Sequence, residues 1–243
     1  MPQYVAPNTD VSRLAFMSRA IKTAEAMPPN ATQHIPAPLL AELTAHYQAY
    51  RAAYEAAQAA LSRRKTETAE SAAAMARLQM YLSHLWQSVS NRVQRENLPV
   101  GVLGYYRLTN DGSRPTPSRR EEWLEIATTV VSGDAQAVLD GYPAAASPSA
   151  AELQAVLAIA IAESNDLPIA DAAYDKAQAI LDALRPKADA LIKSLRAAII
   201  YSTHELDPAS QRRVLRNYGS VYRYVSGEVL DEGDDTAVIG EEV

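Results

Sequence analysis

Apolar residues in the first half of the chain recur at alternating steps of four and three positions. One run comprises Leu43, Tyr47, Tyr50, Tyr54, Ala57 and Leu61, and a second comprises Met75, Leu78, Leu82, Leu85 and Val89. This heptad-like spacing is typical of long helices that pack nearly antiparallel to one another. Between the runs, residues 62–68 contain no large apolar side chain. We therefore predict two helices joined by a solvent-exposed turn at residues 62–68.

The second half of the chain repeats part of this pattern. An offset of 120 residues relates 52–61 to 172–181, Tyr81 to Tyr201, His84 to His204 and Arg92 to Arg212. Such self-similarity is the signature of an internal repeat. Pro186 stands where the first copy has Thr66, and proline suits the first turn of a helix better than its interior. We predict that a new helix begins near Pro186, so that each copy is a helical hairpin.

Two hairpins that each expose an apolar face most simply pack against one another. We therefore predict an all-α fold in which the duplicated hairpins form a four-helix-type bundle, with extra short helices and extended terminal segments. The first repeat would cover residues 1–117 and the second, packed with it in one domain, residues 118–226. Residues 227–243 would form an acidic tail.

Capping and turn residues mark the shorter elements. Thr9 and Asp10 are good caps for a helix that ends near Met27, and Ser118 with Glu121 has the spacing of a capping box. The remaining expectations are extended segments at 102–108 and 221–225, short helices at 134–139 and from Pro208 onward, and a kink or break at 165–168.

Composition narrows the class of protein. Hydrophobic residues make up 48% of the 243 positions, which is enough for a packed core, and the absence of cysteine excludes disulfides and thiolate metal sites. The first residues lack the pattern of a signal peptide. No apolar run approaches the ~20 residues of a membrane span. We expect a cytoplasmic protein with no membrane partner.

The repeated Tyr-x-x-His pattern is the sharpest chemical signal, since two imidazoles related by a pseudo-twofold axis could share a metal or a haem. On a helical wheel, however, His84 and His204 lie about 120° from the apolar positions, near solvent. The chain also contains no Glu-x-x-His motif of a di-iron bundle, no glycine-rich phosphate loop and no serine-nucleophile elbow. We predict no catalytic residue, no metal site and no cofactor.

A basic segment alternates arginine with tyrosine near the end of the chain. Its arginines are Arg212, Arg213, Arg216 and Arg223. This composition suits single-stranded nucleic acid, but the net charge of −6 disfavours that partner. The acidic tail offers a nearer complement, on the same chain or on a neighbouring copy. We expect self-association in which these arginines face Glu228, Asp231, Glu232, Asp234 and Asp235.

Two functions remain on the sequence alone. The first is a non-enzymatic structural or assembly subunit that associates with itself, as a homo-oligomer or larger assembly, through bundle faces and terminal arms. The alternative is a helical bundle that binds a small ligand or cofactor between its helices. For that alternative the candidate binding residues are Tyr54, Tyr81, Tyr174 and Tyr201.

Overall fold

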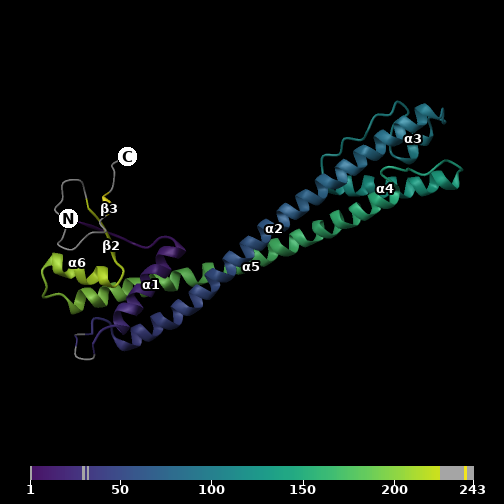
Figure 1. Ribbon diagram of the computed structural model, residues 1–243. Coiled ribbons are helices and arrows are strands. Elements are labelled where there is room, and N and C mark those ends of the chain that lie inside the picture. Colours follow the sequence, from purple (N-terminus) through teal and green to yellow (C-terminus); the bar gives the residue numbers. More distant parts are fainter. Residues whose placement is uncertain (1, 29–30, 32, 225–237, 240–243) are drawn as a thin grey trace. The chain divides into compact units, whose positions relative to one another are not determined.

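The computed structural model describes residues 2–28, 31, 33–224 and 238–239 (Figure 1). Its helices are α1 (Asp10–Glu25), α2 (Ala37–Arg95), α3 (Val102–Tyr105), α4 (Arg120–Leu139), α5 (Ala150–Ser202) and α6 (Pro208–Asn217). Its strands are β1 (Gln3–Val5), β2 (Val221–Tyr224) and β3 (Val238–Ile239). The predicted all-α class is confirmed, with one small sheet in addition.

The chain divides into two compact units. The first unit comprises Met1–Ala59 and Asp175–Val243, and the second comprises Ala60–Tyr174. Helices α2 and α5 each contribute one part to either unit. Neither unit coincides with the predicted repeats 1–117 and 118–226, because each unit takes residues from both.

The predicted turn at residues 62–68 is wrong, because α2 runs through this segment without a break. The segment contains neither glycine nor proline, so its residues can continue a helix. Arg63 also forms an ion pair with Glu67, one turn later, at 3.4 Å. The missing apolar residues therefore mark a solvent-exposed stretch of helix rather than its end.

The breaks expected in α5 are also absent, since Pro168 and Pro186 both lie inside the helix. An interior proline costs about 3 kcal/mol or more. Both prolines are exposed, so water can bond to the carbonyl groups that they leave without a donor. Buried residues flank each of them, such as Ala170 and Ala188, and their packing holds the helix together.

These two corrections remove the predicted pair of hairpins. Residues 52–92 belong to a single helix, whereas residues 172–212 contain the end of α5, a turn and the start of α6. The two segments therefore differ in where the chain turns. The 120-residue repeat remains a feature of the sequence, and the bundle of duplicated hairpins is replaced by two long helices with shorter elements packed on them.

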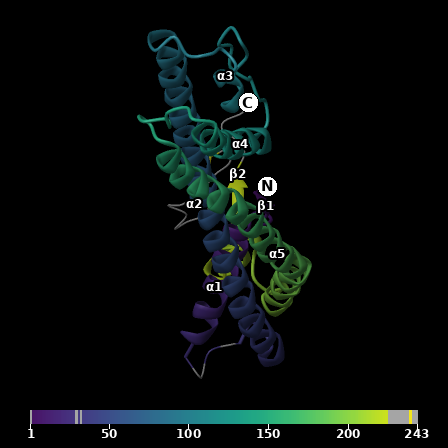
Figure 2. The same cartoon turned by 90° about the vertical axis from the view of Figure 1, so that its right-hand side faces the viewer.

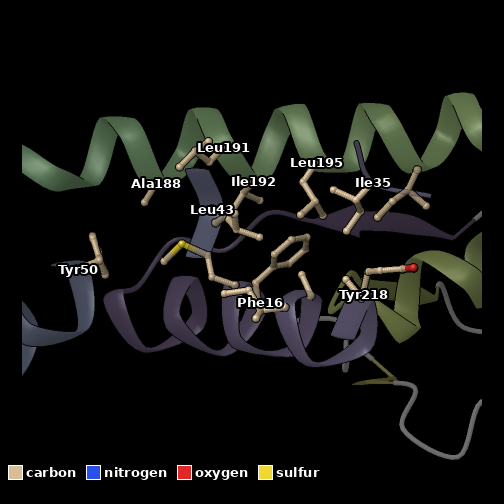
Figure 3. Packing of buried hydrophobic residues seen from close by; sticks show 14 of the residues in the cluster. Phe16, Ile35, Leu43, Tyr50, Ala188, Leu191, Ile192, Leu195 and Tyr218 are labelled. Carbon is tan, nitrogen blue, oxygen red and sulfur yellow. The ribbon is translucent and has the colours of Figure 1, made fainter. Parts of the chain in front are cut away.

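The core of the first unit gathers side chains from α1, α2, α5 and the segment around α6 (Figure 3). Its central residues are Phe16, Leu43, Tyr50, Leu195 and Tyr218. Strand β2 confirms the extended segment expected at 221–225 as far as Tyr224; it pairs antiparallel with β1 and parallel with β3. The predicted cap at Thr9 is also confirmed, because its side chain accepts a hydrogen bond from the backbone N–H of Ser12.

The core of the second unit lies where α4 runs beside the end of α2 and the start of α5 in both views (Figures 1 and 2). Trp86 comes from α2, Val130 from α4 and Leu153 from α5. The segment at 102–108, expected to be extended, instead begins with the single turn α3, which buries Val102 and Leu103. The separate helix expected at 134–139 is the last part of α4.

Candidate self-association surface

Helix α5 carries large apolar side chains that the fold leaves in water. Ile159 is 49% exposed, Ile169 is 61% exposed and Ile180 is 50% exposed. Among the residues that the structure describes, α5 is also the one helix long and apolar enough to cross a membrane by length and composition, although only 28% of its most apolar window is buried. Contiguous exposed apolar surface is where proteins interact, so the arrangement of these side chains along α5 decides whether this helix is a candidate surface.

These isoleucines belong to a regular series, which we call the α5 seam. The series consists of Ile159, Ala162, Asp166, Ile169, Ala173, Lys176, Ile180 and Ala183, all of them exposed. Its steps alternate between three and four residues, which is the spacing of a helix that packs along another helix. At 100° per residue the centre of the α5 seam lies about 180°, 160° and 80° around the helix from the buried positions Leu153, Ala160 and Ala170, respectively. The helix therefore has a second face suited to helical packing.

Contacts in the second unit fix the rotation of α5 there. Arg64 on α2 donates from Nε to Oδ1 of Asp171 at 2.6 Å, and its guanidinium lies over the ring of Tyr174 at 5.3 Å. Leu153, Val156 and Ala160 turn toward the core of the second unit. With that side of α5 turned inward, Ile159 and Ile169 remain in solvent.

A buried polar network stiffens the second unit. The hydroxyl of Tyr106 donates to Oδ1 of Asp134 at 2.7 Å, and the backbone N–H of Ala145 donates to the same oxygen at 2.7 Å. Arg92 donates to the carbonyl oxygen of Ala144 at 2.5 Å and to the hydroxyl of Tyr106 at 3.5 Å. Burial and the neighbouring Asp134 raise the pKa of Tyr106 to about 12. The network joins α2, α4 and the chain that leads into α5.

The first unit contains a network of the same residue types. Arg185 on α5 and Tyr50 on α2 both donate to the carboxylate of Asp10 on α1. Arg13 forms a two-bond contact with Asp189, at 2.7 and 3.1 Å, and an ion pair with Asp10 at 3.6 Å. Neither network is predictable from the sequence, because the partners are far apart in the chain and no local spacing relates them.

The four tyrosines proposed as ligand contacts lie in different surroundings. Tyr81 and Tyr174 belong to the second unit, where Tyr174 contacts Arg64; Tyr81 is 17 residues from Arg64 on α2, or about 25 Å along the helix. In the first unit, Tyr54 packs against the core, whereas Tyr201 is 80% exposed. The structure therefore does not gather these side chains around one ligand.

The predicted placement of the repeated histidines is confirmed, since His84 and His204 are both exposed. His204 stacks on the ring of Tyr201 with 5.9 Å between centroids. The buried histidine is instead His46, whose Nε2 lies 3.2 Å from the carbonyl oxygen of Leu184. Burial lowers the pKa of His46, so that its neutral form is favoured near neutral pH.

The arginine-rich segment forms part of α6 and β2. The guanidinium of Arg216 lies 5.3 Å from the ring centre of Tyr222 and donates a hydrogen bond to the hydroxyl of Tyr224. Arg213 and Arg223 are exposed, and Arg212 is half-buried. The acidic residues expected to face this segment, Glu228, Asp231, Glu232, Asp234 and Asp235, lie outside the described residues.

A cavity of 430 Å³ lies beside this segment in the first unit. Phe16, Arg19, Arg216 and Tyr222 contribute to its lining. Ser220 also lines it, and its buried hydroxyl has no hydrogen-bond partner among the residues that the structure describes. The cavity offers positive charge beside aromatic rings, but none of the four candidate tyrosines lines it.

Three carboxylates approach one another in the second unit. One oxygen each of Glu67, Glu70 and Glu163 lies within 4.8 Å of the others, the one such group among the residues that the structure describes. Partial burial, followed by the charges of Glu70 and Glu67, raises the pKa of Glu163. Carboxylate oxygens suit hard divalent cations, but clustered acids at a helix surface are common without one.

Comparison with known proteins identifies no relative, because no protein-family model, no curated protein and no solved structure matches the chain.

Proposed function

We propose that the protein is a non-enzymatic assembly subunit whose copies associate with one another through the α5 seam. The observation that carries this proposal is the exposure of Ile159, Ile169 and Ile180 at helical packing intervals on one helix. Burying a fully exposed side chain of this size contributes about 1.5–3 kcal/mol, and these isoleucines, which are 49–61% exposed, retain about half of that gain for association. Three per copy can offset the loss of translational and rotational freedom on association.

The series of small and large residues favours a helix as the partner. Alanines separate the isoleucines at Ala162, Ala173 and Ala183, and small residues allow two helix backbones to approach closely. Two helices pack along one another when both present apolar residues at heptad spacing. The α5 seam of a second copy of the chain has this spacing.

A membrane is the other apolar environment that α5 could meet. Its sequence places Glu163, Asp166 and Asp171 within the same stretch as the exposed isoleucines. An acidic side chain at the centre of a bilayer costs about 2.5–3.5 kcal/mol even on the most permissive scale. The charges therefore favour a protein partner and an aqueous location.

Sedimentation velocity over a range of concentrations tests the proposal. The full chain should form a concentration-dependent oligomer, and Ile169→Glu should shift it toward monomer because a carboxylate cannot be buried unpaired. Leu139→Glu is the matched control, since Leu139 is 79% exposed at the end of α4 and outside the α5 seam. Circular dichroism shows whether both variants keep their helices.

Two results would contradict the proposal. One is a full chain that remains monomeric at every concentration. The other is equal loss of association in Ile169→Glu and Leu139→Glu, which would mean that the seam has no special role. Flotation of the wild-type chain with phospholipid vesicles would point to a membrane as the partner of α5 instead.

A further inference from the structure

We infer that two copies of α5 pair antiparallel, in a register that places Asp166 of each copy against Lys176 of the other. This inference rests on the proposed function and specifies its partner and geometry. It follows from the order of residues along one uninterrupted helix, Ala150–Ser202.

The register is set by which residues of the α5 seam face each other. In an antiparallel pair centred on residue 171, the layers are Ile159 with Ala183, Ala162 with Ile180, Asp166 with Lys176, and Ile169 with Ala173. The twofold axis generates the same four layers again. Each isoleucine thus meets an alanine, and alternating large and small residues across a helix pair lets the layers interdigitate.

The two charged positions select this register over its neighbours. Shifting one helix by seven residues would place Asp166 against Ile169 or against Ala183, and would bury its carboxylate beside an apolar group. A parallel pair in register would place Asp166 against Asp166 and Lys176 against Lys176. Like charges in contact are unfavourable and an unpaired buried charge is costly, so only the antiparallel register pairs both charges.

The participating groups are available for this contact. Asp166 and Lys176 are both exposed. Eight layers between Ile159 and Ala183 extend over about 36 Å of helix. The twofold axis makes two such charged layers, and polar positions in an apolar seam are a known device for fixing the register of paired helices.

Charge reversal in the full-length chain tests the pairing of Asp166 with Lys176. Asp166→Lys and Lys176→Asp should each raise the dimer dissociation constant about tenfold or more, because each places like charges in contact. The double variant Asp166→Lys/Lys176→Asp should recover most of the affinity. Asp175→Lys is the matched control, since Asp175 is exposed on the same helix but lies off the α5 seam. A double variant no tighter than the single variants would overturn the register.

Cysteine crosslinking tests the orientation independently, because the chain has no native cysteine. A mixture of Ala162→Cys and Ile180→Cys chains should oxidise to a heterodimer, whereas either variant alone should not crosslink. In the antiparallel register, two copies of residue 162 lie about 27 Å apart, beyond the reach of a disulfide. Crosslinking of Ala162→Cys with itself would show parallel pairing and overturn the inference.

Different results would contradict association through the α5 seam and the antiparallel register. If Ile169→Glu leaves association unchanged, the α5 seam is not the contact surface and both proposals fall. If Ile169→Glu dissociates the oligomer but the charge exchange and the mixed crosslink both fail, association through the α5 seam stands and only the antiparallel register is lost.

Discussion

Arg185 on α5 holds Asp10 on α1 through two parallel hydrogen bonds, from Nε to Oδ1 at 2.8 Å and from Nη2 to Oδ2 at 2.7 Å. Tyr50 on α2 donates to the same carboxylate at 2.6 Å. One aspartate at the start of α1 therefore connects the short helix to both long helices of the first unit. Charge-assisted, two-bond contacts of this kind are stronger than neutral hydrogen bonds.

Replacing this carboxylate should destabilise the first unit. We expect Asp10→Asn to lower the free energy of unfolding by about 1–3 kcal/mol, because Arg185 loses its two-bond contact with a carboxylate and keeps its ion pair with Asp182. Urea denaturation followed by circular dichroism measures the change. Glu25→Gln on the same helix is the control, since Glu25 is exposed, and it should change stability by less than about 0.5 kcal/mol. Equal effects of the two changes would show that Asp10 has no special role.

Thr9 and Asp10 differ in how much of their role can be predicted from the sequence. The cap and start of α1 were predictable, because capping depends on residues three positions apart. The role of Asp10 in joining three helices was not, since Arg185 is 175 residues away in the chain. Similarly, helical periodicity predicts the buried positions of α2, but the turn predicted at residues 62–68 is wrong, because apolar content cannot distinguish an exposed helix from a loop.

The α5 seam is difficult to recognise in the sequence for a related reason. Ile159, Ile169 and Ile180 are separated by alanine, aspartate and lysine, so the apolar signal at these positions is diluted. Sequence periodicity shows that a helix has apolar faces, but only the structure shows which face another helix already covers. The exposed series becomes recognisable once Ala160 and Ala170 are known to be buried.

Alkaline pH should weaken the first unit through Tyr50. Burial and the adjacent Asp10 raise the pKa of Tyr50 from its usual 10.0 to about 12. The folded state thus binds the phenolic proton more tightly than the unfolded state does. Its contribution to stability is complete below pH 10 and is lost as pH rises toward about 12. Tyr50→Phe should be less stable at pH 8 and lose less additional stability at pH 11, as measured by urea denaturation at both values.

A matched comparison identifies the group responsible. Tyr201→Phe is the matched control, because it removes the hydroxyl of a tyrosine that is 80% exposed. If Tyr50→Phe loses as much stability between pH 8 and pH 11 as the wild type does, other groups account for the alkaline loss.

Arg92 and Asp134 should be strongly coupled in the second unit, although they act through Tyr106 rather than by direct contact. Both are buried, with 9% and 5% exposure. Removing one member of a buried charged network leaves the other uncompensated and costs about 3–5 kcal/mol. We therefore expect Arg92→Met and Asp134→Asn each to lower the free energy of unfolding substantially. The double variant should lose at least about 1 kcal/mol less than the sum of the two single losses, because it removes both charges together. Denaturation of the four proteins in a double-mutant cycle measures this coupling.

Arg95→Met, at an exposed position in the last turn of α2, should be close to neutral and additive with Asp134→Asn. Additivity of Arg92→Met with Asp134→Asn would show that Tyr106 does not transmit an interaction between the two charges.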